Sequence, residues 1–186
     1  MSILNNIGIV IIGRNEGRRI EKCVRSVLDS GAAFIYVDSN SSDNSVEIVK
    51  RTGANILELD KSAPMSAARA RNAGYKWLIK NVHGLKYVHF IDGDCELNKN
   101  WPKLACEKLD NENDIAVVCG RLREKNISKS IYTKLSDIGW YIRPGETYSC
   151  GGIATIRVST FTKLNGFDES LIAGEEPEFY LRVRKM

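Results

Sequence analysis

The 186-residue chain has few histidines, no paired cysteine motif and no long apolar run. With only His83 and His89 available, acid–base catalysis by histidine has little support, and His89 lies in an apolar run where packing is the favoured interpretation. The five cysteines are an odd number and none are spaced as Cys-x-x-Cys, so neither a disulfide framework nor a zinc site is predicted. Reduced thiols in a cytosolic protein are the simpler interpretation.

The longest apolar stretch near the start, Ile9 to Ile12, is too short for the core of a signal peptide or for a membrane span. We therefore expect a cytoplasmic protein without a transmembrane segment, with peripheral association at the inner face of a membrane left open. The net charge of +4 is too small and too scattered to indicate a nucleic-acid-binding protein, although it suits a site that attracts a phosphorylated ligand.

Three familiar motifs are also missing. The turn after the first apolar run contains only Gly13 and Gly17, so the Gly-x-Gly-x-x-Gly fingerprint of dinucleotide-binding folds is absent. The chain has no Gly-x-x-x-x-Gly-Lys-Ser/Thr phosphate loop, and it has no Gly-x-Ser-x-Gly nucleophile elbow.

Short β-branched runs alternate along the chain with segments of helical periodicity. This alternation predicts a single α/β domain whose central sheet is mostly parallel and is flanked by helices on both faces. We expect strands at residues 7–12, 33–37, 55–59, 86–91, 115–119 and 153–157. We expect helices at residues 20–28, 46–49, 66–81 and 100–109, and one more whose first position is Pro177. Residues 123–149 show no clear pattern.

Asp92, Gly93 and Asp94 directly follow the apolar run 87–91. In a strand, two residues separated by one other project to the same side, and the glycine lets the backbone approach a ligand. Two carboxylates at the end of a buried strand suit a hard cation such as Mg²⁺ or Mn²⁺, which shares its other positions with a substrate's phosphates. A solvated Asp-Gly turn is the alternative interpretation.

Polar segments follow three of the predicted strands, at residues 13–17, 38–43 and 92–94. The carboxyl ends of parallel strands meet at one edge of the sheet, and ligands of open α/β sheets bind outside that edge. We therefore expect these three segments to line one cleft.

The motifs of this chain, taken in order, resemble those of family 2 glycosyltransferases of the GT-A fold, and the resemblance covers essentially the whole chain. The residues that carry it are 11–16 (Ile-Ile-Gly-Arg-Asn-Glu), 37–43 (Val-Asp-Ser-Asn-Ser-Ser-Asp), 70–74 (Ala-Arg-Asn-Ala-Gly), 90–94 (Phe-Ile-Asp-Gly-Asp), 166–169 (Gly-Phe-Asp-Glu) and 174–179 (Gly-Glu-Glu-Pro-Glu-Phe).

The resemblance implies that the nucleotide is held by the turn containing Asn15 and Glu16 and by Asp38, whose carboxylate can accept a hydrogen bond from a base. It also implies that Arg71 serves the nucleotide or its diphosphate, while Arg69 points elsewhere. The family commonly has two aspartates where this chain has Asp38 followed by serine, so the identity of the base stays open.

For catalysis, the resemblance implies that Asp94 contacts Mn²⁺ or Mg²⁺ and that Asp92 contacts the ion and the ribose. The family's usual Glu-Asp pair places the general base at its second residue, which is Glu176 here, and Glu175 is the reserve candidate. The exchange of Asp for Glu at this position moves the carboxylate one methylene further from the backbone.

Two further features have open interpretations. Gly151 and Gly152 precede a predicted strand, where they could admit the donor sugar or the acceptor close to the backbone, or simply form a bulge. Trp140 and Tyr141 lie in the segment without a clear pattern, where stacking on a sugar and packing in a core are equally plausible alternatives.

The resemblance implies an inverting, metal-dependent, hexosyltransferase-like enzyme that moves a sugar from a nucleotide-diphosphate sugar to the hydroxyl of a glycan, lipid-linked or protein acceptor. Residues 1–97 would form the nucleotide-binding part and residues 98–186 the acceptor and catalytic part, incomplete at its C-terminal end. A nucleotidyltransferase, or a truncated donor-binding domain without turnover, are the alternatives. The sequence leaves the oligomeric state open.

Overall fold

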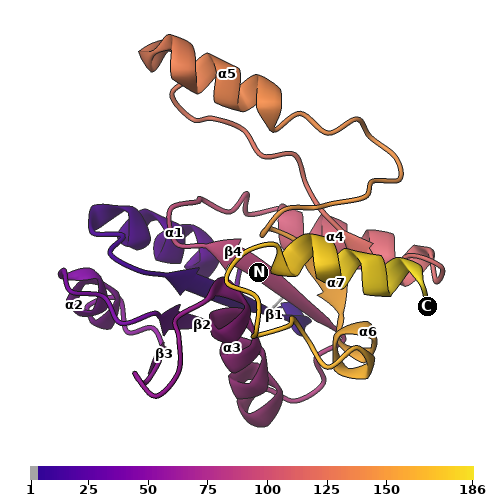
Figure 1. The fold of residues 1–186 in the computed structure, drawn as a ribbon, viewed down its shortest axis with the longest axis horizontal. Helices are drawn as coiled ribbons and strands as arrows, with labels where there is room; N and C mark the ends of the chain where they lie inside the picture. The colour runs from indigo at the N-terminus through magenta and orange to yellow at the C-terminus, as the bar shows by residue number, and fades with distance from the viewer. Residues whose placement is uncertain (1–3) are drawn as a thin grey trace.

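The computed structural model describes residues 4–186 as an α/β fold built on one six-stranded sheet in the order β3-β2-β1-β4-β6-β5 (Figure 1). The strands are β1 (Leu4–Gly13), β2 (Ala32–Asp38), β3 (Ile56–Glu58), β4 (Tyr87–Asp92), β5 (Val117–Val118) and β6 (Thr155–Arg157). The helices are α1 (Arg18–Leu28), α2 (Ser45–Lys50), α3 (Ala67–Asn81), α4 (Trp101–Asn111), the 3₁₀ turn η1 (Ile127–Lys129), α5 (Ile131–Gly139), α6 (Val158–Lys163) and α7 (Glu175–Arg184).

Strand β1 runs parallel to β2 and to β4, and β2 runs parallel to β3. Only the edge differs, because β6 pairs antiparallel with both β4 and β5. The predicted mostly parallel sheet is therefore confirmed, and its parallel half carries the three polar segments at one edge.

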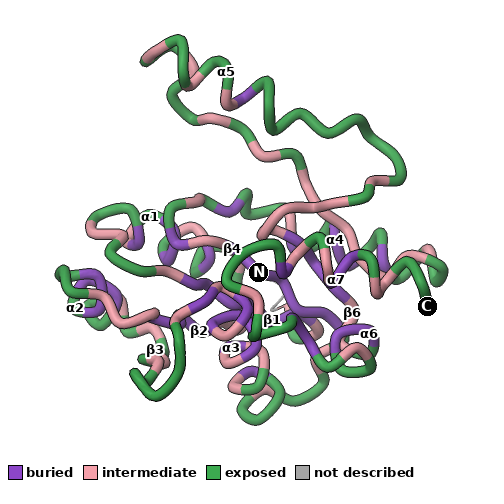
Figure 2. Tube along the Cα trace, in the orientation of Figure 1, coloured by how far each residue is buried: buried purple, intermediate pink, exposed green. Residues whose placement is uncertain are grey.

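Alternate residues of β1 point into two separate cores, as expected for a strand that is buried on both faces. Ile7, Ile9 and Ile11 pack in the core that contains residues of α1, α2 and α4. Val10 and Ile12 pack in the core that contains residues of α3, α6 and α7. Figure 2 shows the sheet strands as the most buried part of the molecule. The β-branched run thus becomes the rigid centre from which the polar loops extend.

Helix α3 lies directly on the sheet. A Cβ atom at Gly74 would collide with the side chains of Val10 and Val37, so only glycine allows this close approach. Ser66 caps the helix by accepting a hydrogen bond from the backbone N–H of Arg69 at 3.2 Å. This packing fixes the position of α3 on the face of the sheet formed by β1 and β2.

Three local features differ from the sequence-based expectations. The fifth strand is shortened to Val117–Val118 at the edge of the sheet. Helix α7 begins two residues before Pro177, after Gly174 in the left-handed conformation with a φ of 85°, so the proline occupies the third helical position rather than the first. Helix α6, which directly follows β6, was not expected.

The segment without a clear sequence pattern contains η1 and α5. Residues 121–148, which we call the α5 arm, rise from the body and return to it, so that α5 stands apart from the sheet and its helices (Figure 1). Most of the arm is exposed or half-buried (Figure 2). Within the described residues, no helix has the length and apolar character needed to cross a membrane.

Candidate active site

The register of the sheet brings the predicted polar segments together. Gly13 at the end of β1 pairs with Asp38 at the end of β2, and Ile12 pairs with Asp92 at the end of β4. Gly93 then donates its backbone N–H to the carbonyl of Ile12 at 2.7 Å. The expectation that the three segments meet at one edge of the sheet is confirmed by this pairing.

The turn after β1 is tied to the loop after β2. Asn15 adopts a left-handed backbone with a φ of 57°, accepts a hydrogen bond from the N–H of Ser42 at 2.7 Å and donates its own N–H to Ser41 Oγ at 2.9 Å. The N–H groups of Glu16 and Gly17 both donate to Ser45 Oγ, at 3.0 and 2.9 Å. These hydrogen bonds fix the position of the turn after β1 relative to the loop after β2.

Asp38 is only 1% exposed and anchors the loop that follows it. Its carboxylate accepts hydrogen bonds from the Tyr36 hydroxyl at 2.8 Å, from Ser41 Oγ at 2.6 Å and from the Ser41 N–H at 2.7 Å. Burial, followed by the charge of Asp38, raises the pKa of Tyr36, so this hydroxyl stays a donor. In this structure Asp38 shapes the loop, and a direct contact with a nucleotide base stays a prediction.

Arg71 lies at the centre of the site, 3% exposed, where α3 faces β4 and α7. Its Nη1 donates to Glu175 Oε1 at 2.6 Å, and its Nη2 lies 3.0 Å from Asp92 Oδ1 and 2.9 Å from Glu176 Oε1. Three carboxylates from two distant parts of the chain therefore share one guanidinium. Arg69 points away and binds Asp60 at 2.9 Å, as its position two residues earlier on the helix requires.

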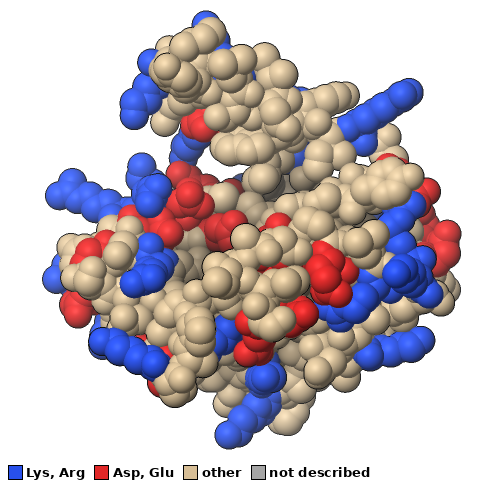
Figure 3. Space-filling view, in the orientation of Figure 1, with Lys and Arg blue, Asp and Glu red and all other residues tan. Residues whose placement is uncertain are grey.

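We define the Arg71 cluster as Arg71, Asp92, Glu175 and Glu176. Its charges do not balance, and not all of its hydrogen-bonding groups have a partner. The carboxylates outnumber the guanidinium three to one, and Arg71 Nε is buried without a hydrogen-bond partner among the described residues. The space-filling view shows acidic side chains gathered on the body below the α5 arm (Figure 3). An excess of buried carboxylate favours an additional cation or a proton at such a place.

Glu175 and Glu176 occupy different environments although they are adjacent. The Glu175 side chain is 8% exposed and is held by the short bond to Arg71, whereas Glu176 is 19% exposed. Burial raises the pKa of Glu176, while the Arg71 guanidinium acts in the opposite direction. A carboxylate with a raised pKa that solvent can still reach is the better placed of the two to take up a proton.

Asp92, Asp94 and Glu16 form a second group of acids beside the cluster. Although 41% of the Asp92 side chain is exposed, desolvation raises its pKa, Arg71 lowers it and the charge of Asp94 raises it again. Desolvation also raises the pKa of Glu16, with Arg19 opposing and Asp94 adding to the effect. Glu16 Oε2 lies 2.9 Å from Arg19 Nη2, but it has no hydrogen bond of acceptable geometry.

Within residues 4–186, no three acidic, histidine or cysteine side chains converge closely enough to hold a metal ion by themselves. The available donor set is Asp92 and Asp94, and the charge of Asp94 raises the pKa of Asp92. Magnesium-type ions are commonly held by one or two carboxylates, with water and substrate phosphates in the other positions. The residues present therefore fit a divalent cation whose coordination is completed by a phosphorylated substrate.

Gly152 packs against the Arg71 cluster. A Cβ atom at this position would lie 2.6 Å from Glu176 Oε1 and 3.0 Å from Asp92 Oδ2, and it would also collide with Arg71. Its neighbour Gly151 has a φ of 60° and accepts a hydrogen bond from the Tyr180 hydroxyl at 2.9 Å. Both predicted glycines thus border the cluster, and only a glycine at position 152 lets the backbone come this close to Arg71 and Glu176.

The remaining candidates are placed as follows. His89 is fully buried, bonds to Thr155 Oγ1 at 3.0 Å and has its pKa lowered to about 3 by desolvation, so it is a packed residue as expected. Trp140 and Tyr141 are 42% and 54% exposed on the α5 arm, so the core-packing alternative for them is wrong.

Asn72 was missed as a functional position. Its side chain donates to the carbonyl of Phe167 at 2.8 Å and to Glu169 Oε1 at 3.0 Å, and it accepts the Phe167 N–H at 3.0 Å. The Asn72 amide therefore ties the turn before α7 to α3, directly beside Arg71. The motifs at residues 70–74 and 166–169 are visible in the sequence. Only the fold shows that Asn72 of the first motif bonds to Phe167 of the second.

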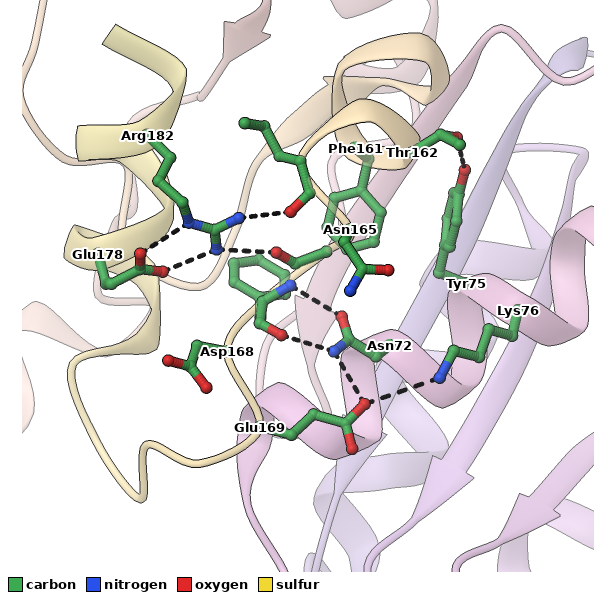
Figure 4. A pocket seen from close by; sticks show the side chains of 13 residues that line it. Asn72, Tyr75, Lys76, Phe161, Thr162, Asn165, Asp168, Glu169, Glu178 and Arg182 are labelled. Carbon is green, nitrogen blue, oxygen red and sulfur yellow. Dashed lines mark hydrogen bonds and ion pairs between the residues drawn. The ribbon is translucent and has the colours of Figure 1, made fainter. Parts of the chain in front are cut away.

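A hollow of about 650 Å³ lies beyond Asn72, between α3, α6 and α7 (Figure 4). Its polar groups bond to one another: Tyr75 contacts Thr162 at 2.6 Å, and Glu178 binds Arg182 at 2.7 Å. None of the acids of the Arg71 cluster lines this hollow. It is therefore a feature separate from the candidate active site.

Comparisons with known proteins identify the family and the fold of the chain. Residues 8–163 match the family described as Glycosyl transferase family 2. No curated protein matches the chain. Among solved structures, S. aureus TarS (residues 1–349) superposes with a TM-score of 0.68 at 18% identity over 95% of this chain and 54% of that one.

Two further structures have the same architecture. The mannosyltransferase PcManGT from Pyrobaculum calidifontis, in complex with GDP-Man and Mn²⁺, gives a TM-score of 0.65 at 16% identity over 94% of this chain and 50% of that one. Glucosyl-3-phosphoglycerate synthase from Mycobacterium tuberculosis, in complex with Mn²⁺, UDP and glucosyl-3-phosphoglycerate, gives 0.56 at 20% identity over 86% and 59%. The likeness shows the fold, and the chain spans little more than half the length of these structures.

Proposed function

Because the chain belongs to glycosyl transferase family 2, we propose that it transfers a sugar from a nucleoside-diphosphate sugar to an acceptor hydroxyl. The observation that carries the proposal is the Arg71 cluster, which gathers Arg71, Asp92 and Glu176 at the carboxyl edge of the parallel strands. This is the edge at which α/β sheets bind their ligands.

We assign donor binding to the part of the molecule formed by residues 1–97. The loops containing Asn15, Glu16 and Asp38 lie beside one another and border the end of β4. Related structures were solved with GDP-Man and with UDP, which supports a nucleoside diphosphate as the leaving group and leaves the base open. Gly151 and Gly152 would face the donor sugar, because the backbone at Gly152 lies directly against the carboxylates of the cluster.

A divalent cation, Mn²⁺ or Mg²⁺, fits the proposal, with Asp94 and Asp92 as the residues that would hold it. When bound, such an ion neutralises the charge that develops on a departing diphosphate. Arg71 adds a fixed positive charge beside Asp92 and stays in place because Glu175 holds its other nitrogen at 2.6 Å. Two related structures contain Mn²⁺, which supports a divalent metal.

Glu176 is the proposed general base, and residues 98–186 form the part that receives the acceptor. The acceptor hydroxyl would give its proton to the Glu176 carboxylate as its oxygen attacks the anomeric carbon. The bond from that carbon to the diphosphate breaks in the same step, so the configuration at the carbon inverts. Glu176 is the more exposed glutamate of the cluster, which supports this assignment over Glu175.

The test is a panel of nucleotide sugars incubated with the protein and Mn²⁺ or Mg²⁺, with release of the nucleoside diphosphate as the signal. We expect at least one donor to lose its sugar, to water or to an added acceptor, with the anomeric configuration of the first-formed product inverted in NMR spectra. Release of pyrophosphate instead would establish a nucleotidyltransferase. Binding of the donor without turnover would indicate a donor-binding domain that needs further sequence.

A further inference from the structure

Helix α5 is amphipathic, and its apolar face is exposed to solvent. Ile131, Leu135 and Ile138 lie on one stripe of the helix at spacings of four and three, and they are 63%, 57% and 69% exposed. Tyr132 extends the same face and is 77% exposed. A surface helix of a globular protein normally turns such a stripe toward its core, so this face lacks its partner within the described residues.

The polar side of α5 packs against residues 121–124 at the start of the arm. Asp137 is the one buried residue of the helix, and its Oδ1 accepts hydrogen bonds from Arg123 Nε at 3.0 Å and from the Glu124 N–H at 2.9 Å. Arg121 approaches the other carboxylate oxygen at 3.5 Å. These ion pairs fix the rotation of α5 about its axis, so the exposure of the apolar stripe is built into the arm.

The rest of the arm also exposes large apolar side chains, most of them aromatic. After the helix come Trp140, Tyr141 and Ile142, which are 42%, 54% and 38% exposed, and Tyr148 is 79% exposed. Rings with an apolar body and a polar edge are the side chains that favour the boundary between water and lipid.

The charge of the arm indicates what covers this face. Residues 121–148 contain six basic and three acidic residues. Lys129, Lys134 and Arg143 form no ion pair with any residue of the described chain, 4–186. Figure 3 shows basic side chains at the border of the arm, whose visible surface is otherwise mostly uncharged. Two copies meeting through this face would oppose like charges, whereas an anionic surface complements it.

We propose that the α5 arm docks on a bilayer containing anionic phospholipids. The stripe of Ile131, Leu135 and Ile138 enters the boundary between head groups and acyl chains, and Lys129 and Lys134 bind lipid phosphates. The arm ends only three residues before Gly151, so docking holds the mouth of the candidate active site close to the membrane surface. Docking is independent of turnover and is measured without a sugar donor.

The experiment is co-sedimentation of the protein with phosphatidylcholine vesicles that contain or lack 30 mol% phosphatidylglycerol, about the content that gives a strongly negative surface. We expect binding to the anionic vesicles that weakens with added salt, and at least about tenfold weaker binding to the neutral ones. The double variant Leu135→Asp, Ile138→Asp loses the binding. Ile172→Asp, at a position that is 81% exposed outside the arm, keeps it.

Lys129→Glu combined with Lys134→Glu separates charge from apolar contact, and we expect it to abolish the preference for anionic vesicles. Circular dichroism of each variant checks the fold. We expect the fold to be unchanged, because the exposed stripe does not pack in the core. Absence of vesicle binding by the parent protein, or equal binding by the Leu135→Asp, Ile138→Asp variant, overturns the proposal. A dimer in sedimentation velocity that this variant dissociates, without vesicle binding by the parent, assigns the face to a second copy instead.

Discussion

Arg71 and Glu175 are separated by 104 residues in the chain and meet at 2.6 Å between Nη1 and Oε1, both nearly inaccessible to solvent. This bond joins α3, in the first half of the chain, to the first turn of α7 near its end. It makes Glu175 the positioning partner of Arg71 and leaves Glu176 the more accessible of the two adjacent acids. The division of roles between two neighbouring glutamates is the basis of the predictions on catalysis.

Replacing Arg71 by alanine should destabilise the fold strongly. The change leaves Glu175, Glu176 and Asp92 without their common cation in a largely buried place, which costs about 3–5 kcal/mol when one partner of a buried pair is removed. The matched control is Arg25→Ala, which removes an exposed pair with Glu21 and should change the free energy of unfolding by about 0.5 kcal/mol or less. Urea denaturation measures both, and equal effects would contradict the central role of Arg71.

Glu176→Gln should lower turnover about 10²–10⁴-fold, the usual contribution of a general base, while donor binding changes little. Glu175→Gln should act differently, because it weakens the bond that positions Arg71, and we expect a loss of stability with a smaller loss of turnover. Release of nucleoside diphosphate and calorimetric titration of the donor are the two measurements. If Glu175→Gln abolishes turnover and Glu176→Gln does not, the assignment of the base is reversed.

Gly152→Ala should damage the site more than the fold. Its methyl group would lie 2.6 Å from Glu176 Oε1, and the carboxylates and Arg71 would have to separate. Gly139→Ala is the control, since a methyl group at this position in α5 meets no atom within 4 Å. We expect at least a tenfold loss of turnover in the first variant and none in the second. Unimpaired turnover by Gly152→Ala would show that this glycine does not border the reacting groups.

His89 should make the fold sensitive to acid. Burial lowers its folded-state pKa to about 3, below the ordinary histidine value of 6.5, so between these values the unfolded chain binds a proton that the folded chain does not. This contribution to stability is complete above pH 6.5 and decreases as the pH falls toward 3, by up to about 1.4 kcal/mol per pH unit. His89→Gln, measured by urea unfolding at several pH values, should flatten the profile in this range. Parallel profiles would contradict the buried neutral state.

The sheet could be predicted because its longer strands are continuous apolar, β-branched runs that are recognisable in the sequence. The β-branched run of β1 is buried on both faces, and Asp92 and Asp94 end the adjacent strand where a ligand edge is expected. Alternation of strands and helices then sufficed for the parallel half of the sheet. The antiparallel edge was not predicted because β5 and β6 are two and three residues long, too short to show a direction in the sequence.

The site was predicted as a set of residues and not as a set of contacts. The resemblance to the family's motifs identifies Arg71 and Glu176, but the ion pair between them and the place of Gly152 depend on how α7 returns to α3. Asn72, which holds that return, was overlooked because its partners lie 95 residues away. Helix α5 was missed for a different reason: residues 123–149 show no clear pattern in the sequence, and the apolar stripe of the helix faces solvent instead of a core.

The most direct test of the central claim is titration of UDP and GDP into the protein in the presence of Mn²⁺ or of a chelator, repeated with Asp94→Ala. The matched control is Asp114→Ala, an exposed position outside the cluster. We predict that at least one nucleoside diphosphate binds with Mn²⁺, and that its affinity falls at least about tenfold with the chelator and in Asp94→Ala but not in Asp114→Ala. Diphosphate binding that is indifferent to both the metal and Asp94, or no binding at all, would contradict the account.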